Sequence, residues 1–159
     1  AEIPAETIRG MNSHHVIILA KNNTGRVNLY KLVSSSFLDY FSGKPRIPKS
    51  MLAKYREGLI IGSACEQGEL FRALLDEASV DRIAEIVNFY DYLEIQPLGN
   101  NRFMIEDKDI EIVNNMDDLM ELNREIVRLG EEAGKPVVAT CDVHFLDPGD
   151  DIYRKIIMI

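Results

Sequence analysis

Residues 58–76, GLIIGSACEQGELFRALLD, decide the fold because they join a strand pattern, a polar loop and a helix pattern in one unit. The apolar run GLIIGS at 58–63 is short and continuous, which is typical of a buried strand. The residues after the loop predict a helix over about 67–76. A strand that leads directly into a helix is the building unit of α/β proteins, so we expect the rest of the chain to repeat it.

The same unit recurs along the chain. Apolar runs predict further buried strands at 15–20, 91–97 and 136–140. Apolar residues at helical spacing predict helices over 24–41, 50–56, 79–89 and 117–130, and a short one after Asp150 or Asp151. The alternation predicts an α/β fold with a mostly parallel sheet flanked by helices. Four strands are few for a closed barrel, so the sheet is either open or part of a barrel whose first strands are missing.

Two of these segments depend on particular residues. The helix over 24–41 is predicted from a stripe made of Val27, Tyr30, Val33, Phe37 and Phe41. The helix over 117–130 is predicted to start at an Asp117 cap and to end near Gly130. Between them, FMIED in the stretch 98–115 is interpreted as a short extended piece.

Length and composition bound the class of protein. The chain has 159 residues, enough for one domain with its own hydrophobic core. It is 46% hydrophobic and 28% charged, the balance of a water-soluble globular protein. Its formal net charge of −8 argues against a main nucleic-acid-binding surface, because phosphate binding favours a basic face. No apolar run approaches the roughly 20 residues that span a membrane.

The cysteines and the two ends of the chain add further expectations. Cys65 and Cys141 are too few for a disulfide scaffold, which predicts free thiols and a cytoplasmic location. The chain starts at Ala1 instead of Met and ends at Ile159 inside an apolar segment, so we expect it to be part of a longer protein. Residues 1–13 have no clear period and are interpreted as a linker or lead-in.

The sharpest local signal is TCDVH at 140–144, directly after a predicted strand. If the chain stays extended there, Asp142 and His144 project to the same side, because strand side chains alternate. A carboxylate and an imidazole at the carboxyl end of a strand provide two ligands for a divalent metal. The alternative is a capping Asp beside a histidine in a solvated loop.

Cys65 follows the strand at 58–63, so it is predicted to lie at the same end of the sheet as Asp142 and His144. A thiolate at that position is a soft ligand suited to zinc. The alternative is a buried free thiol that packs as a small hydrophobic group. Alternation turns Cys141 away from the site, so it is interpreted as a packing residue, with a place in the metal shell as the alternative.

Three more residues are candidates on weaker grounds. His14 and His15 precede the first strand, where one could face a pocket and the other solvent. His15 opens its predicted strand whereas the other candidates close theirs, so either the chain bends at 13–15 or that strand starts later. Glu94 lies inside the strand at 91–97, and a buried carboxylate must be paired or ligated. It either orients a metal ligand or forms a salt bridge with a neighbouring Arg or Lys.

The proline-punctuated loop KPRIPK, residues 44–49, carries the basic side chains Lys44, Arg46 and Lys49. It is interpreted as a solvated loop, with contact to a phosphate backbone as the alternative. The chain has no Gly-rich phosphate loop and no Gly-x-Ser-x-Gly elbow, so neither a P-loop nucleotide site nor a serine hydrolase is supported.

Four segments, in order, resemble the PHP (polymerase and histidinol phosphatase) domain of bacterial DNA polymerase III α subunits. They are HVIILAKNNTGRVNLYKLVSSSFLDYF at 15–41, KPRIPKSMLAKYREGLIIGSACEQGELFRALL at 44–75, FYDYLEIQPLGNN at 89–101 and GKPVVATCDVHFLDPGDDIYRKI at 134–156. IGSACEQGEL and FYDYLEIQPLGNN are most similar to the PolC type. The resemblance implies that residues 14–159 are the C-terminal part of a PHP domain, and thus part of a distorted (β/α)7 barrel.

The resemblance also implies a set of metal ligands. The family's barrel binds several divalent metals, and its motifs fall on His15, Cys65, Asp142 and His144 in this sequence. Cys141 stands where the family usually has Gly or Asn, and Glu94 and Cys141 are the candidates for supporting contacts. The family's remaining ligand motifs match nothing in residues 1–14. A site that is only partly occupied, by zinc or manganese, is therefore expected.

Two functions follow from the resemblance. In the first, the domain is a metal-binding module that stabilises a PolC-type replicative DNA polymerase, whose other parts handle DNA and catalyse polymerisation. In the second, metals held by the same residues activate water for phosphoester hydrolysis, as in a proofreading 3′–5′ exonuclease. We expect the structural role here, with no catalytic residue in this chain. An incomplete barrel exposes strand edges and apolar helix faces, so we also expect self-association.

Overall fold

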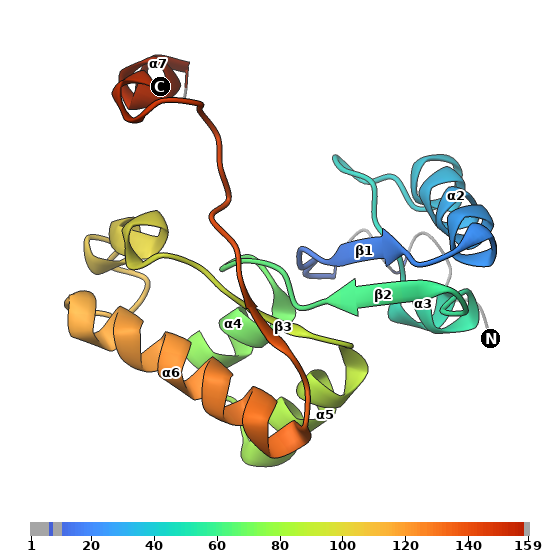
Figure 1. The fold of residues 1–159 in the computed structure, drawn as a ribbon, viewed down its shortest axis with the longest axis horizontal. Coiled ribbons are helices and arrows are strands. Elements are labelled where there is room, and N and C mark those ends of the chain that lie inside the picture. The colour runs from blue at the N-terminus through green and yellow to red at the C-terminus, as the bar shows by residue number, and fades with distance from the viewer. Residues whose placement is uncertain (1–6, 8–10, 158–159) are drawn as a thin grey trace.

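The computed structural model describes residue 7 and residues 11–157 (Figure 1). Most of the predicted lead-in at 1–13 therefore lies outside the described residues. The strands are β1 (Ile17–Ala20), β2 (Leu59–Gly62), β3 (Leu93–Ile95) and β4 (Val137–Ala139). The helices are α2 (Asn23–Leu38), α3 (Lys49–Lys54), α4 (Glu69–Leu75), α5 (Val80–Phe89), α6 (Met116–Ala133) and α7 (Asp151–Ile157), with 3-10 helices η1 (Leu98–Ile105) and η2 (Pro148–Asp150).

The mixed α/β class is confirmed, but the strands form two short pairs. β3 and β4 are parallel, with Leu93 opposite Val137. β1 and β2 are antiparallel, with Ile17 opposite Gly62, where the alternation of strands and helices had predicted parallel pairing. Hydrophobic periodicity identifies a strand but carries no information on the direction in which the chain enters it. A single parallel bridge between Gly62 and Tyr92 connects the two pairs.

Two local predictions were wrong. FMIED is not extended, because it belongs largely to η1, where Met104 is fully buried. Asp117 is not the cap of α6, because Asn115 takes that position and accepts from the backbone N–H groups of Asp117 and Asp118. The Asp118 carboxylate accepts in return from the Asn115 backbone, which closes a capping box that the sequence pattern did not reveal.

The hydrophobic core draws buried side chains from all five helices α2 to α6 and from β2, β3 and η1. Within it, α6 packs along β3 and β4 (Figure 1). α6 turns Leu119 and Ile126 inward, at 2% and 1% exposure, as its apolar stripe predicts. Gly130 lies inside this helix, which ends at Ala133 rather than near Gly130 as predicted. A Cβ at Gly130 would lie 2.3 Å from a methyl group of Val137, so the glycine lets α6 approach β4 closely. Burial of each large aliphatic side chain contributes about 1.5–3 kcal/mol, so Leu119 and Ile126 are a substantial part of what holds α6 to the body.

The helix α2 buries the face opposite to its apolar stripe. Its buried face consists of Gly25, Asn28, Leu32 and Ser36. The stripe that predicted the helix faces outward, with Tyr30 at 63% and Phe37 at 56% exposure. The helix itself is confirmed, but its apolar side is not covered by any part of the chain that the structure describes.

The C-terminal segment leaves the body of the molecule after β4. It runs without regular structure to η2 and α7, which stands apart from the other helices (Figure 1). Ile152, Ile156 and Ile157 of α7 are all more than half exposed. Of the helices in the described ranges, none has the length and apolar character to cross a membrane.

Candidate metal centre

His15 and Cys65 meet because β1 and β2 are antiparallel. Ile17 pairs with Gly62, so the residues before β1 lie beside those that follow β2. The backbone N–H of His15 donates to the carbonyl of Gln67 at 2.9 Å, which fixes His15 against the loop that carries Cys65. The Sγ of Cys65 lies 3.4 Å from the Nδ1 of His15. The antiparallel direction of β1 thus explains why His15, which precedes its strand, lies beside Cys65, which follows the end of β2.

The separation of these two atoms fits two ligands of one tetrahedral zinc. With Zn–S of about 2.3 Å and Zn–N of about 2.1 Å, such ligand atoms lie about 3.5 Å apart. Burial raises the pKa of the Cys65 thiol from 9.0 to about 11, and the Glu66 carboxylate adds to the rise. Metal-free Cys65 is therefore a thiol at neutral pH, and an ion that binds it must displace a proton.

Asp142 and His144 form a second pair. The Nε2 of His144 lies 3.0 Å from the Oδ2 of Asp142, and each side chain is 46% exposed. Strand alternation does not explain this contact, because β4 ends at Ala139 and Asp142 has a left-handed φ of +46°. The two side chains meet in an irregular segment in which Asp142 has a left-handed backbone, and their exposure leaves both accessible from solvent.

Glu94 and Asn100 hold the segment that leads to this pair. The hydroxyl of Thr140 donates to the Oε1 of Glu94 at 2.6 Å. The side-chain amide of Asn100 donates to the backbone carbonyl of Cys141 at 2.9 Å. Glu94 is buried and has no ion pair with Arg or Lys among the described residues, so its charge is met by hydrogen-bond donors. The Cys141 side chain is exposed, which differs from the packing role predicted for it.

Sequence reasoning did not single out Thr140, Asn100 or Ser63. Ser63 accepts from the backbone N–H of Glu94 at 3.0 Å and so joins β3 to the loop that carries Cys65. For Thr140 the signal was its position in TCDVH, beside the candidate ligands. For Asn100 and Ser63 the sequence offers no comparable signal, because their contacts join segments that are far apart in the chain.

The two pairs do not merge into one cluster. Among residue 7 and residues 11–157, no group of three or more His, Cys, Asp or Glu side chains could hold a metal ion. The structure brings His15 to Cys65 and Asp142 to His144, but it does not bring all four together. Each pair by itself supplies two ligands, which is fewer than a zinc site needs.

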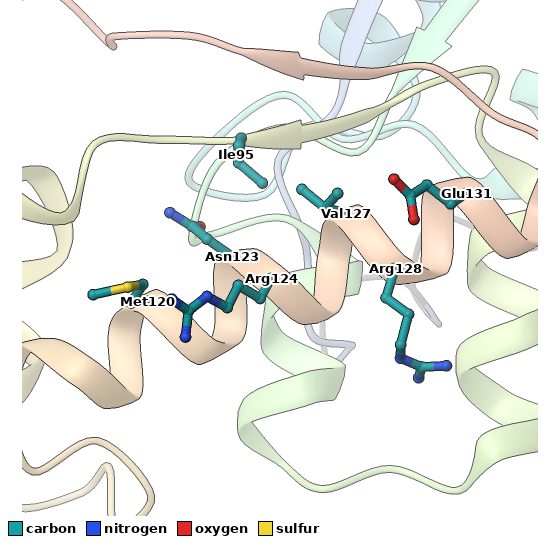
Figure 2. A pocket seen from close by; sticks show the side chains of 7 residues that line it. All are labelled: Ile95, Met120, Asn123, Arg124, Val127, Arg128 and Glu131. Atoms are coloured by element: carbon teal, nitrogen blue, oxygen red, sulfur yellow. The ribbon is translucent and has the colours of Figure 1, made fainter.

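A separate groove of about 300 Å³ lies between β3 and α6 (Figure 2). Figure 2 shows Ile95 and Val127 pointing toward each other, while Arg124 and Arg128 point away from the strand. Arg128 forms ion pairs with Glu125 and Glu132 of its own helix, and its guanidinium holds the pKa of Glu125 below its usual range. The groove contains no histidine or cysteine, so it is not part of the candidate metal centre.

The described elements place the chain in the mixed α/β class. The PHP domain family matches residues 2–106, two thirds of the chain, and the chain belongs to this family. The resemblance to the PHP domain described from the sequence is therefore confirmed.

The chain is also similar to DNA polymerases III of the PolC type. It is 56% identical over 151 residues to the one from Clostridium perfringens (strain 13 / Type A), and the matched region covers 95% of this chain and 10% of that protein. It is 48% identical over 145 residues to the one from Bacillus subtilis (strain 168), which covers 91% of this chain and 10% of that protein. The chain thus spans about a tenth of the length of the curated relatives that it matches.

Proposed function

We propose that the chain is a segment of the PHP domain of a PolC-type replicative DNA polymerase, in which it acts as a structural metal-binding module. The observation that carries the proposal is the 3.4 Å contact between His15 and Cys65, in a chain 56% identical to a PolC-type polymerase. DNA is contacted through the intact polymerase, which works in the cytoplasm. The rest of the polymerase chain is the principal partner.

His15, Cys65, Asp142 and His144 are the proposed ligands of zinc or manganese. The thiol and imidazole suit zinc in particular, while the carboxylate is compatible with either ion. Glu94 acts as a support, because it holds Thr140 two residues before Asp142. Joining the two pairs into one site requires the C-terminal segment to move relative to β2, so the module by itself is expected to be only partly occupied.

The outward face of α2 supports the idea that more polypeptide surrounds this segment. Tyr30, Val33 and Phe37 form an exposed apolar surface of the kind that proteins usually bury against a partner. In the intact polymerase we expect other parts of the chain to cover it and to complete a distorted (β/α)7 barrel. In isolation, the same surface would drive self-association.

An enzymatic role is the second candidate. It is favoured by the Asp142 and His144 pair, whose 46% exposure would let a substrate reach metals bound there. A bound metal would supply Lewis-acid activation of water and of a phosphodiester. In that case the intact polymerase would carry a metal-dependent phosphoesterase or proofreading 3′–5′ exonuclease activity at this site.

Metal analysis separates a formed site from an empty one. We expect the purified chain to retain zinc or manganese after dialysis, and Cys65→Ser to release it. Cys141→Ser is the matched control, because the Cys141 side chain is exposed and its hydrogen bond to Asn100 runs through its backbone carbonyl. If neither variant loses metal, or if the unmodified chain holds no metal, a site at His15 and Cys65 is ruled out.

The enzymatic role is tested in the intact polymerase, with any separate exonuclease domain inactivated. Asp142→Ala and His144→Ala would each abolish the remaining nuclease activity if metals at these residues activate water. Residual activity that is unchanged in both variants would remove the enzymatic reading and leave the structural one. Thermal stability is measured beside it, since a structural metal site lowers stability when its ligands are lost.

A further inference from the structure

The C-terminal helix α7 is amphipathic, but its apolar side is not used within the chain. Its apolar residues recur at i, i+1, i+4 and i+5, so they share one side of the helix, namely Ile152, Tyr153, Ile156 and Ile157. Each of these side chains is more than half exposed. None of the described residues of α7 is buried, so this apolar side needs a partner that the described part of the chain does not supply.

The outward side of α2 presents the same kind of surface. The helix packs its opposite side against β1 and β2, which leaves Val27, Tyr30, Val33 and Phe37 between 44% and 63% exposed. Phe37 stacks on Phe41 with ring centroids 6.1 Å apart, which extends the apolar surface beyond the end of the helix. The chain therefore carries two open apolar helix faces.

The borders of the two faces have complementary charges. Arg26 and Lys31 are exposed, and α2 contains no acidic residue. Arg26 precedes Tyr30 by one helical turn, so it lies on the outward side. Before α7, the carboxylates of Asp147 and Asp150 accept from each other's backbone N–H groups, and neither has an ion pair in the described part of the chain. An apolar helix preceded by an acidic segment thus matches an apolar helix with a basic border.

The two faces do not meet within one molecule. Figure 1 shows α7 and α2 at opposite sides of the molecule. The outward side of α2 also points away from the strands against which the helix packs, so α7 of the same chain would have to pass around the body to reach it. A second copy of the chain can bring its own α7 to this face with both folds unchanged.

We propose that two copies of the chain associate by exchanging this contact, so that α7 of each copy packs on the outward face of α2 in the other. The pairing is two-fold symmetric, because each copy gives one α7 and receives one. It buries both apolar faces and brings Asp147 and Asp150 of one copy near Arg26 of the other. The inference rests on the self-association expected under the proposed function and names the contact that produces it.

The two faces are tested separately and then together, by sedimentation of the 159-residue chain. One variant replaces Val33 and Phe37 of α2 by Ser, and the other replaces Ile152 and Ile156 of α7 by Ser. Each variant should associate about tenfold more weakly than the unmodified chain, because both of its contacts are damaged. A mixture of the two variants contains one undamaged contact between α7 and α2, so the mixed pair should be about threefold tighter than either variant with itself.

The matched control carries Val80→Ser and Leu146→Ser, which remove side chains that are 85% and 91% exposed and lie outside both helices. It should change the association less than about twofold. A monomeric unmodified chain, equal weakening by the control, or a mixture no tighter than the separate variants would overturn the proposal. Metal content is measured on the same samples, so failure of this contact with metal retained would leave the proposed metal-binding module standing.

Discussion

The helices α6 and α2 were both predicted from apolar stripes, but only α6 buries its stripe. In α6 the apolar stripe is covered, with Leu119 at 2% and Ile126 at 1% exposure. In α2 the apolar stripe is open, with Phe37 at 56% exposure, while the opposite face packs against the body. The contrast shows that a stripe identifies the face that needs a partner, but not whether the partner lies in the same chain.

The covered face of α2 explains why this helix is nonetheless held in place. Asn28 donates from its side-chain amide to the carbonyl of Glu57 at 2.9 Å. Gly25 packs directly on Gly58, because a Cβ at Gly25 would lie 1.8 Å from the Gly58 carbonyl oxygen. α2 is thus held by close backbone approach, a hydrogen bond and the single large apolar side chain on its buried face, Leu32, which is fully buried.

The largest expected difference between the two helices comes from a matched pair of leucines. Leu119→Ala in α6 removes a buried side chain and should lower the free energy of unfolding by about 3 kcal/mol. Leu38→Ala in α2 removes a side chain that is 83% exposed and should cost less than about 0.5 kcal/mol. Urea denaturation at one low protein concentration measures both. Similar costs for the two variants would mean that the outer face of α2 is covered in solution.

The glycine contact under α2 gives the next effect. Gly25→Ala forces a methyl group against the backbone of Gly58, which cannot give way as a side chain does, so we expect a loss of about 2 kcal/mol. Gly99→Ala is the control, because no atom lies within 4 Å of its added Cβ. The same denaturation experiment applies. A Gly25→Ala chain as stable as the Gly99→Ala chain would show that α2 is not seated on Gly58.

These contrasts show which parts of the fold the sequence could predict. Strand and helix positions were predicted to within a few residues, because apolar periodicity is a local property. The Asn115 cap and the η1 helix were missed, since Asp117 is an equally good capping type and a short apolar segment such as Phe103–Ile105 fits either conformation. The direction of β1 and the exposure of α2 depend on contacts between distant segments, which no local pattern encodes.

The candidate site likewise has one contact that the sequence could predict and one that it could not. Asp142 and His144 lie two residues apart, so their contact was predictable, although an irregular segment with a left-handed Asp142 produces it rather than an extended strand. His15 and Cys65 were linked by family resemblance alone, and their contact depends on the antiparallel pairing that periodicity could not reveal. Whether the two pairs join is a question of how the segment after Ala139 is placed, and its sequence contains no strong local signal for that.

The open face of α2 should also govern association. Replacing Val33 and Phe37 by Ser removes apolar surface and should weaken self-association about tenfold, as measured by sedimentation equilibrium. Phe103→Ser is the control, because Phe103 is half exposed on η1 rather than on α2. A monomeric unmodified chain would contradict the prediction, as would equal weakening by the control variant.

The smallest effect concerns the contact between His15 and Cys65, where β1 joins the body. Burial raises the pKa of Cys65 to about 11, above its ordinary 9.0, so the folded state favours the neutral thiol. This contribution to stability is fully present below pH 9.0 and is lost as the pH rises toward about 11, because the unfolded thiol ionises first. In metal-free chain carrying Cys141→Ser, alkylation of Cys65 at pH 8 should be about tenfold slower than after denaturation. The higher pKa lowers the thiolate fraction about a hundredfold, and the greater nucleophilicity of a more basic thiolate offsets about tenfold of that loss. Equal rates would mean that Cys65 is not buried against β1, and added zinc should slow the folded rate further if His15 and Cys65 both bind it.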